Sequence, residues 1–347
     1  MLSAVLVEPG RLEVEEVPEP EPGPGEVVLR VQSALTCTAD LRAYRLGLKA
    51  PGPLGHEFSG QVWRVGADVR GFREGDAVMT AHVAPCGECF LCSRGQGNLC
   101  ENLEAGMAVG GFAEFVRVGA PIVRQNMFLK PASLSYAEAA FLEPLASVVQ
   151  GLGSIPIDPD DTVIILGCGT VGLLCLACLQ ALERSPRVLV VGRGPERLEL
   201  ARTMGAELVI DAETEPVVDL VRERTAGLGA QVVMDCAGQP ESWAQMLDLA
   251  SRGSHILLFG GCPGALPVDL DTTRLHYDQI ALVGTSHFTP RAVRSARDLL
   301  VGHRVRPAPI LSGSFPLRQI SQAFGRLDRG EGTKFEIVPQ STEASGR

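Results

Sequence analysis

Hydrophobic and polar positions alternate along several stretches of the first 120 residues of the chain. The alternation is clearest over residues 27–31, 60–66 and 111–118, where it predicts half-buried β-strands. Proline and glycine separate these stretches, most densely over residues 18–25, and they indicate loops. A helical pattern follows over residues 135–152. The first part of the chain therefore predicts a β-rich domain.

From about residue 160, short apolar runs alternate with helical segments. Such alternation is typical of a parallel sheet that is buried on both faces. A helix over residues 291–301 follows, and residues 334–339 predict a strand that returns to the first domain. The polar residues 340–347 are expected to be frayed. The predicted strands of the parallel sheet are 162–166, 188–191, 207–210, 231–235, 255–259 and 280–283, with helices from residue 171 and over 196–204.

Composition and charge narrow the class of protein. The 347 residues are enough for two domains with separate cores, and 45% hydrophobic content is ordinary for a soluble globular chain. The formal net charge of -10, without a basic run, argues against nucleic acid or an anionic membrane as partner. No apolar run reaches the roughly 18 residues of a membrane span, and the N-terminus lacks a signal-peptide pattern. We therefore expect a cytoplasmic protein with reduced cysteines.

Four cysteines lie close together with the spacing C-x2-C-x2-C-x7-C. Four thiolates can close a tetrahedron around Zn²⁺ with no open position, which is typical of a structural site. The surrounding segment, residues 85–101, is rich in glycine and polar residues and has no apolar core, so metal binding would supply its folding energy. Two disulfides or four free thiols are the alternative. The four residues are Cys86, Cys89, Cys92 and Cys100.

A G-x-G-x-x-G motif lies between a predicted strand and a predicted helix, at residues 167–172. This context is typical of a dinucleotide site, although an ordinary strand-to-helix turn is the alternative. Gly167 allows the tight turn, Gly169 lets the backbone approach a pyrophosphate, and Gly172 lets helix and strand pack closely. Thr170 and Val171 open the helix, whose free N–H groups and dipole favour an anion.

The residues after the second strand of this series bear on the choice between NAD and NADP. NAD enzymes place Asp or Glu there to bind the ribose 2′-hydroxyl. In this chain Gly192 and Arg193 stand in place of the acid, and Arg197 follows. A small residue followed by arginine leaves space and positive charge for a 2′-phosphate, so we expect NADP to be favoured over NAD. The alternative is that Arg193 faces solvent and that NAD binds without the carboxylate.

A second group of candidate metal ligands lies in the first domain. Cys37, His56, Glu57 and Glu143 carry side chains that bind zinc, but isolated residues of these types carry little information. Their surroundings carry more, because Cys37 is followed by Asp40, His56-Glu57 is followed by a glycine- and valine-rich strand, and Glu143 begins a Glu-Pro-Leu motif. Together with the four-cysteine spacing, these motifs resemble the zinc-dependent medium-chain alcohol dehydrogenases, in the branch of sorbitol, threonine and glucose dehydrogenases. The resemblance covers nearly the whole chain.

The resemblance implies an α/β protein with two domains. A GroES-like β-rich catalytic domain would comprise residues 1–147 and 291–347, with a structural zinc lobe at 85–101, and a Rossmann domain with a doubly wound parallel sheet would comprise 148–290. It also implies two zinc ions per chain, one structural and one catalytic, and a homodimer or homotetramer. Cys37 and His56 would bind the catalytic zinc, with Glu57 and Glu143 as the remaining acids. Asp40 would orient His56.

The implied activity is hydride transfer between a secondary alcohol and NAD(P), which gives the ketone, with zinc as the Lewis acid. A polyol, sugar or cyclitol is the expected substrate. The alternatives are a threonine-type amino alcohol dehydrogenase and a nucleotide-binding relative with weakened catalysis. Two departures from the family concern the proton relay, because Ala39 replaces the usual hydroxyl residue and Arg42 replaces a histidine. Glu57 or Glu143 is then the expected route for the substrate proton.

Several further cysteines and histidines are assigned no role in a site. Cys168 would contribute only its backbone to the glycine turn, and Cys175 and Cys236 are read as packing residues. His82 has no ligand-like partner in the sequence.

Overall fold

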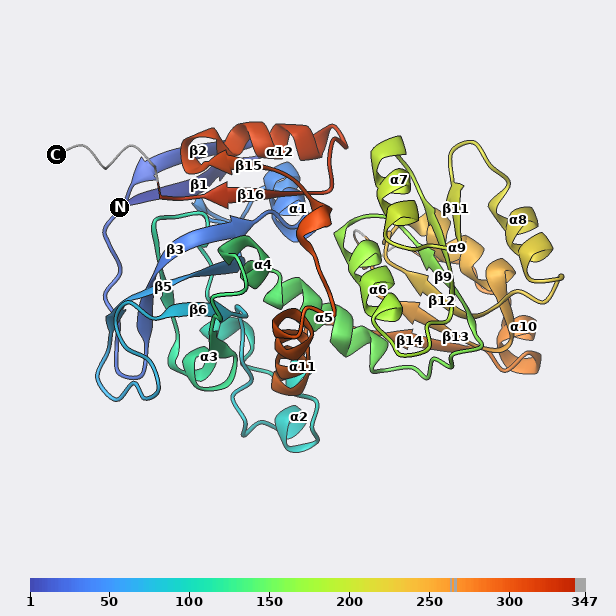
Figure 1. Cartoon of the computed structure of the whole chain (residues 1–347), viewed down its shortest axis with the longest axis horizontal. Helices are drawn as coiled ribbons and strands as arrows, with labels where there is room; N and C mark the ends of the chain where they lie inside the picture. The colour runs from blue at the N-terminus through green and yellow to red at the C-terminus, as the bar shows by residue number, and fades with distance from the viewer. Residues whose placement is uncertain (263, 265–266, 341–347) are drawn as a thin grey trace. The chain divides into compact units, whose positions relative to one another are not determined.

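The computed structural model describes residues 1–262, 264 and 267–340, and it divides the chain into two compact units (Figure 1). Unit 1 is formed by Met1–Ser147 together with the part of the chain from Phe288 onward. Unit 2 is the continuous segment Val148–His287. None of the helices in the described part of the chain is long and apolar enough to cross a membrane.

Unit 1 is built on two β-sheets with a shared apolar core. The larger sheet has the strand order β15-β16-β3-β5-β6-β8, with β7 paired to β3, and the smaller sheet has the order β2-β1-β4. The inward side chains of these strands form one cluster that includes Leu29, Phe58 and Phe335. The strands are β1 (Leu2–Glu8), β2 (Arg11–Glu16), β3 (Val27–Leu35), β4 (Gly52–Pro53), β5 (Glu57–Val65), β6 (Ala77–Thr80), β7 (Phe115–Val118), β8 (Met127–Leu129), β15 (Leu311–Pro316) and β16 (Lys334–Val338).

The end of the chain completes the larger sheet of unit 1. Strand β16 pairs antiparallel with β3, with Ile337 opposite Ala34, so the predicted return of this segment to the first domain is confirmed. Figure 1 shows this as red strands beside a blue one. Gln340 is not frayed, because its side-chain amide donates to the carbonyl oxygens of Val31 (3.2 Å) and Glu114 (3.0 Å). The rest of the expected frayed tail, residues 341–347, lies outside the described residues.

The helical pattern predicted over residues 135–152 forms two helices, α4 (Tyr136–Ala140) and α5 (Leu142–Leu152), separated at Phe141. Pro144 explains the break, because its ring would clash with the carbonyl of residue 140 in a continuous helix and it has no N–H to donate. The break brings Glu143 into the first turn of α5. The predicted strand over 111–118 is also shorter than expected, since only Phe115–Val118 is a strand. The other helices of unit 1 are α1 (Thr38–Leu46), α2 (Phe90–Ser93), α3 (Ala120–Gln125), α11 (Pro290–Val301) and α12 (Ile320–Asp328).

Unit 2 contains a six-stranded sheet in the order β11-β10-β9-β12-β13-β14, and every pairing in it is parallel. Counted from β9, this is the doubly wound order 3-2-1-4-5-6, with its switch point between β9 and β12. The predicted Rossmann fold is therefore confirmed. The strands are β9 (Thr162–Leu166), β10 (Arg187–Gly192), β11 (Leu208–Asp211), β12 (Ala230–Asp235), β13 (Ala250–Leu258) and β14 (Ala281–Gly284), and the helices are α6 (Thr170–Gln180), α7 (Pro195–Thr203), α8 (Val217–Arg224), α9 (Pro240–Leu249) and α10 (Thr272–Tyr277).

Candidate functional site

Cys37 lies where strand β3 ends and helix α1 begins. It is the N-cap residue of α1 in an extended conformation, and its Sγ accepts a hydrogen bond from the amide of Ala39 at 3.4 Å. Burial and then the Glu57 carboxylate raise the pKa of the Cys37 thiol. A buried thiol of this kind becomes a thiolate when a metal ion replaces its proton.

His56 is oriented by a buried carboxylate. Its Nδ1 lies 3.3 Å from Oδ1 of Asp40, which also accepts from the amide of Gly55 at 3.1 Å. Burial lowers the pKa of His56, but Asp40 and Cys37 outweigh it and raise that pKa well above the usual value. With Nδ1 directed at Asp40, the nitrogen that remains for a metal is Nε2, which is the arrangement that metal-binding histidines use.

Glu57 begins strand β5, and its carboxylate is paired with a buried lysine. Oε2 of Glu57 accepts from Nζ of Lys334, which also donates to the carbonyl oxygen of Thr36 at 2.6 Å. Both charged side chains are only 1% exposed. Burial raises the pKa of Glu57 to about 7, although Lys334 acts in the opposite direction. The ligand atoms of Cys37, His56 and Glu57 all lie within 4.8 Å of one another, close enough to share one ion.

Glu143 lies next to this group without being part of it. Its Oε1 is 3.2 Å from Nδ1 of His82, and the His82 ring lies 4.9 Å from the ring of His56. Burial raises the pKa of Glu143, but His82, His56 and Lys334 together outweigh burial, and the pKa is lowered overall. The structure thus gives His82 a contact at the site, which corrects the sequence interpretation that it has no ligand-like partner.

Sequence reasoning missed two residues here, His82 and Lys334. His82 follows β6 within the mostly apolar residues 77–84, whereas Lys334 opens the strand β16 after a polar, glycine-rich segment. A histidine inside a mostly apolar run is the signal that could have found His82, because a buried polar group requires a partner, but Lys334 carries no such signal. The sequence gives no indication of which partner it is.

The sulfur atoms of the four cysteines of the lobe all lie within 4.8 Å of one another. The measured Sγ–Sγ distances are 3.9 Å for Cys86 and Cys92, 3.9 Å for Cys89 and Cys100, and 3.5 Å for Cys86 and Cys100. A tetrahedral zinc site with Zn–S bonds of about 2.3 Å has edges of about 3.8 Å. A disulfide needs sulfur atoms about 2.05 Å apart, so these distances do not fit the disulfide alternative.

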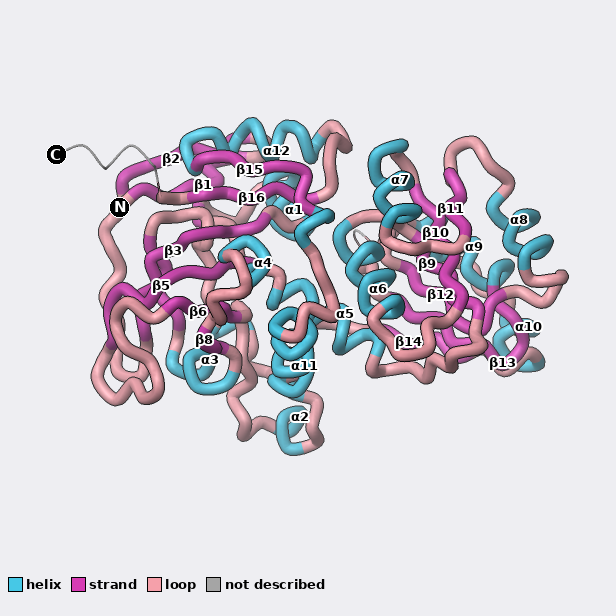
Figure 2. The backbone as a smooth tube through the Cα atoms, in the orientation of Figure 1, coloured by secondary structure: helices cyan, strands magenta, loops and turns pink. Residues whose placement is uncertain are grey.

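Backbone amides of the lobe point at its sulfur atoms. Sγ of Cys86 accepts from the amide of Cys89 at 3.4 Å, and Sγ of Cys100 accepts from the amides of Cys86 (3.3 Å) and Asn102 (3.4 Å). Hydrogen bonds from the backbone of Glu88 and Cys89 lower the pKa of the Cys86 thiol to about 6. Figure 2 shows that the lobe around α2 is mostly loop. These contacts favour thiolates, so the donor set fits Zn²⁺.

The glycine motif of unit 2 connects β9 to α6. Gly169 is the N-cap residue of α6, and Thr170 and Val171 follow in its first turn. A Cβ at Gly172 would overlap the carbonyl oxygen of Gly167, so only glycine lets the helix approach the turn this closely. The motif lies at the carboxyl end of β9, beside the switch point of the sheet, where doubly wound sheets bind nucleotides.

Gly192 ends β10 next to the same turn. A Cβ at this position would overlap Sγ of Cys168, which lies 3.5 Å from the carbonyl oxygen of Arg193. The Cys168 side chain therefore occupies the space beside Gly192, which corrects the expectation that only its backbone matters. Burial raises the pKa of Cys168 while the Arg197 guanidinium opposes that rise, so Arg197 lies within electrostatic range of the turn. Arg193 is exposed.

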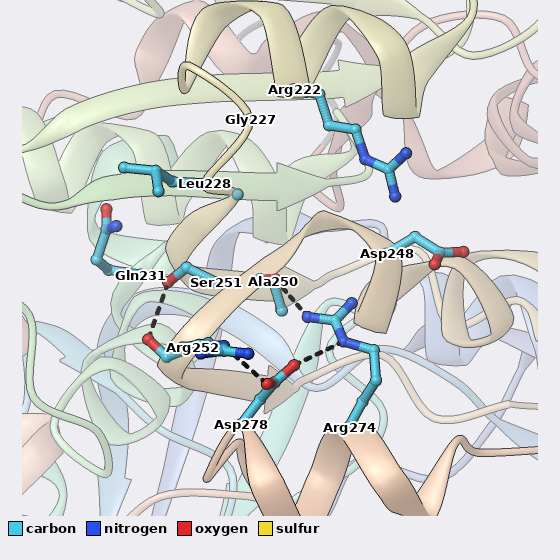
Figure 3. A pocket seen from close by; sticks show the side chains of 11 residues that line it. Arg222, Gly227, Leu228, Gln231, Asp248, Ala250, Ser251, Arg252, Arg274 and Asp278 are labelled. Carbon is cyan, nitrogen blue, oxygen red and sulfur yellow. Dashed lines mark hydrogen bonds and ion pairs between the residues drawn. The ribbon is translucent and has the colours of Figure 1, made fainter.

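A cavity of about 780 Å³ in unit 2 lies elsewhere (Figure 3). Residues at the amino ends of β12 and β13 line it, so it is at the opposite edge of the sheet from the glycine motif. Asp278 pairs with Arg252 (3.0 Å) and with Arg274 (2.9 Å), as the dashed lines in Figure 3 show. The single carboxylate of Asp278 therefore offsets the charge of only one of these two arginines, and the cavity lies away from the glycine motif.

Family models match both units. Residues 23–125 match the alcohol dehydrogenase GroES-like domain, and residues 170–302 match the zinc-binding dehydrogenase model. The L-threonine 3-dehydrogenase of Bacillus subtilis is 32% identical over 93% of this chain and 94% of its own length. The sorbitol dehydrogenase of Halalkalibacterium halodurans is 29% identical over 95% and 96%.

Solved structures of dehydrogenases have the same fold. Alcohol dehydrogenase TADH from Thermus sp. ATN1 matches with a TM-score of 0.89 and 29% identity over 97% of this chain and 99% of its own. A protein of Sinorhizobium meliloti assigned as a zinc-binding dehydrogenase, bound to NADP, has a TM-score of 0.88 and 28% identity over the same shares. An Escherichia coli alcohol dehydrogenase complexed with NADH has a TM-score of 0.87 and 26% identity, again over 97% and 99%. This chain belongs to the zinc-dependent medium-chain alcohol dehydrogenase family.

Proposed function

We propose that this oxidoreductase converts a small hydrophilic secondary alcohol, a polyol, sugar or cyclitol, to the ketone with NADP as the favoured hydride acceptor. The observation that carries the proposal is the partly buried group of Cys37, His56 and Glu57, with Glu143 beside it. A thiol, an imidazole and carboxylates are the ligands of an open zinc site, while four thiols are those of a closed one. We therefore propose one catalytic and one structural zinc per chain.

Each residue of the proposed catalytic centre has a separate role. A zinc ion held by Cys37, His56 and an acid would supply a Lewis acid for the alcohol oxygen. Asp40 fixes the His56 ring, and Lys334 neutralises part of the negative charge that Glu57 brings. Glu57, with a pKa of about 7, is suited to hold the substrate proton near neutral pH, since Ala39 has no hydroxyl for a relay.

The substrate class is proposed from the acids at the centre and from the relatives. Two carboxylates near one ion favour a substrate with several hydroxyl groups, and relatives named sorbitol dehydrogenase and L-threonine 3-dehydrogenase act on small polar molecules. The chain has only 5% aromatic residues, which argues against a hydrophobic substrate channel for long primary alcohols. A threonine-type amino alcohol dehydrogenase is the second candidate, since the threonine enzyme of Bacillus subtilis is 32% identical.

A substrate panel tests this proposal. Polyols, aldoses, inositols, threonine and primary alcohols are each supplied with NADP and with NAD, and the absorbance of the reduced nicotinamide is followed. We expect the highest kcat/KM with a polyol, sugar or cyclitol. A clear preference for a primary alcohol would contradict the assignment, and turnover of threonine alone would replace it with the second candidate. No turnover of any alcohol would indicate a relative with weakened catalysis.

The preference for NADP rests on Gly192 and Arg193, where NAD enzymes place an acid. Solved relatives hold either nucleotide, one NADP and one NADH, so the fold alone does not decide it. We also propose a cytoplasmic homodimer or homotetramer. None of the ten cysteines forms a disulfide, which supports a reducing compartment.

A further inference from the structure

We infer that His82 is a positioning residue, which holds the carboxylate of Glu143 in place for the metal centre formed by Cys37 and His56. The inference rests on the proposed function, because it needs a metal ion at that centre. Neither the glutamate motif nor the spacing of the candidate ligands points to His82, and the contact becomes visible only in the fold.

The contact between Nδ1 of His82 and Oε1 of Glu143 is buried and close enough for an ion pair, although the two groups are not aligned as a hydrogen bond. The Nδ1–Oε1 distance is 3.2 Å, and the two side chains are 6% and 8% exposed. The His82 ring is near two other rings, with its centroid 4.9 Å from that of His56 and 5.9 Å from that of Phe288. Its backbone carbonyl accepts from the amide of Ala108 at 2.8 Å. The imidazole therefore has little freedom to turn away from the carboxylate.

His82 also completes a pattern around Cys37. Asp40 contacts His56, Lys334 contacts Glu57, and His82 contacts Glu143, so each polar group at the centre has its own buried partner. Partners of this kind orient metal ligands, and their loss typically costs 10–100-fold in metal affinity or activity. Lys334 and Asp40 are already engaged elsewhere, so no other residue of this set is free to replace His82.

Metal affinity measured by chelator competition tests the inference. The difference in zinc content between wild type and Cys37→Ser gives the zinc bound at the catalytic site. The zinc of the four-cysteine lobe serves as an internal reference in each variant. His82→Asn retains an N–H donor near the position of Nδ1, while His82→Leu has a similar size and no donor. We expect zinc binding about 10–100-fold weaker in H82L and within about threefold of wild type in H82N. The ligand-field absorption of the Co²⁺-substituted site should change in H82L alone.

A double-mutant cycle separates this role from a structural one. If His82 acts on the metal through Glu143, H82L should add little to the loss of affinity already caused by Glu143→Gln. Melting temperatures of the metal-free variants show any general loss of stability, which would affect the lobe and the centre alike. Unchanged affinity in H82L, or fully additive losses, would overturn the inference while leaving the proposed function intact. Wild type that binds no zinc at this site would overturn both.

Discussion

At the residue scale, the pair of Lys334 and Glu57 shows how charge is accommodated at the centre. A buried carboxylate is costly unless it is paired and hydrogen-bonded, and Glu57 receives both a charge and a proton donor from Lys334. The lysine is itself satisfied by the carbonyl of Thr36. Even so, burial dominates and raises the pKa of Glu57 to about 7. The centre is thus built to hold a proton as well as a metal.

This pKa predicts how the stability of the metal-free protein depends on pH. The pKa of Glu57 is about 7 in the folded protein against an ordinary value of 4.5, so the folded state binds the proton more tightly. Its contribution to stability is complete below about pH 4.5 and is lost as the pH rises through about 7. The shift corresponds to a free energy on the order of 3 kcal/mol.

Urea unfolding of chelator-treated wild type and Glu57→Gln across this pH range measures the effect. We expect the stability of wild type relative to E57Q to decrease by on the order of 3 kcal/mol as the pH rises from about 4.5 to about 7.5. Glu207→Gln is a suitable control, because Glu207 is largely exposed and Arg187 lowers its pKa, so its effect has the opposite sign. If the difference in unfolding free energy between wild type and E57Q did not vary with pH, Glu57 would have an ordinary pKa.

Arg193 carries the prediction on nucleotide choice. Arg193→Ala should raise the KM for NADP about 10–100-fold and change the KM for NAD little, because charge-assisted hydrogen bonds contribute about 1.5 to 3 kcal/mol. Steady-state kinetics with both nucleotides measure the two effects, and Arg202→Ala, on the same helix as Arg197, is a control for a simple loss of charge. Equal losses with both nucleotides would mean that Arg193 does not contact the 2′-phosphate.

Gly192, next to Arg193, limits the substitutions that could change the nucleotide preference from NADP to NAD. Gly192→Asp would supply the acid of NAD enzymes, but its Cβ would overlap Sγ of Cys168. We therefore expect a switch toward NAD only when Cys168→Gly accompanies it. An NAD-specific G192D single variant would contradict this steric argument.

At the scale of elements, the lobe at residues 85–101 would depend on the proposed structural zinc for its fold. It contains only the one-turn helix α2 and a short 3-10 helix, and Phe90 and Leu99 are exposed rather than packed in a core. Cys89→Ser should therefore lower the zinc content by about one ion per chain and make the lobe sensitive to proteases. Unit 2 should still bind nucleotide, since its core is separate.

Metal analysis and limited proteolysis measure these effects. Cys262→Ser, which removes a thiol that belongs to neither metal group in the described residues, should leave both readouts unchanged. Full zinc content and unchanged protease resistance in C89S would contradict a structural zinc in the lobe.

The elements also show what the sequence can predict. The places of the glycine motif and of the four-cysteine group in the fold were predictable, because each is formed by residues close together in the chain, at 167–172 and 86–100. The division into α4 and α5 was missed although its cause, Pro144, is local, because the periodicity of apolar residues continues across the break. The contacts of His82 with Glu143 and of Lys334 with Glu57 could not be predicted, since only the tertiary fold of unit 1 brings these residues together.

At the scale of the whole molecule, the chain leaves unit 1, forms unit 2 as one continuous segment and then returns to unit 1. The doubly wound sheet and its core form from residues 148–287 alone. Unit 1 instead combines strands from both ends of the chain, as the pairing of β3 with β16 shows. The proposed catalytic centre draws on both ends as well, through Cys37 and Lys334.

The return of the chain has a consequence for the order in which a newly synthesised molecule matures. Domains generally fold as their sequence leaves the ribosome. The four cysteines of the lobe are all available once residue 100 has emerged, whereas Lys334 follows Glu57 by 277 positions, with the whole of unit 2 between them. The lobe could therefore take up the proposed structural zinc early in translation, while the proposed catalytic centre closes only when β16 joins the sheet. A ribosome that stalls before β16 would release a chain with a finished nucleotide domain and an unfinished metal centre.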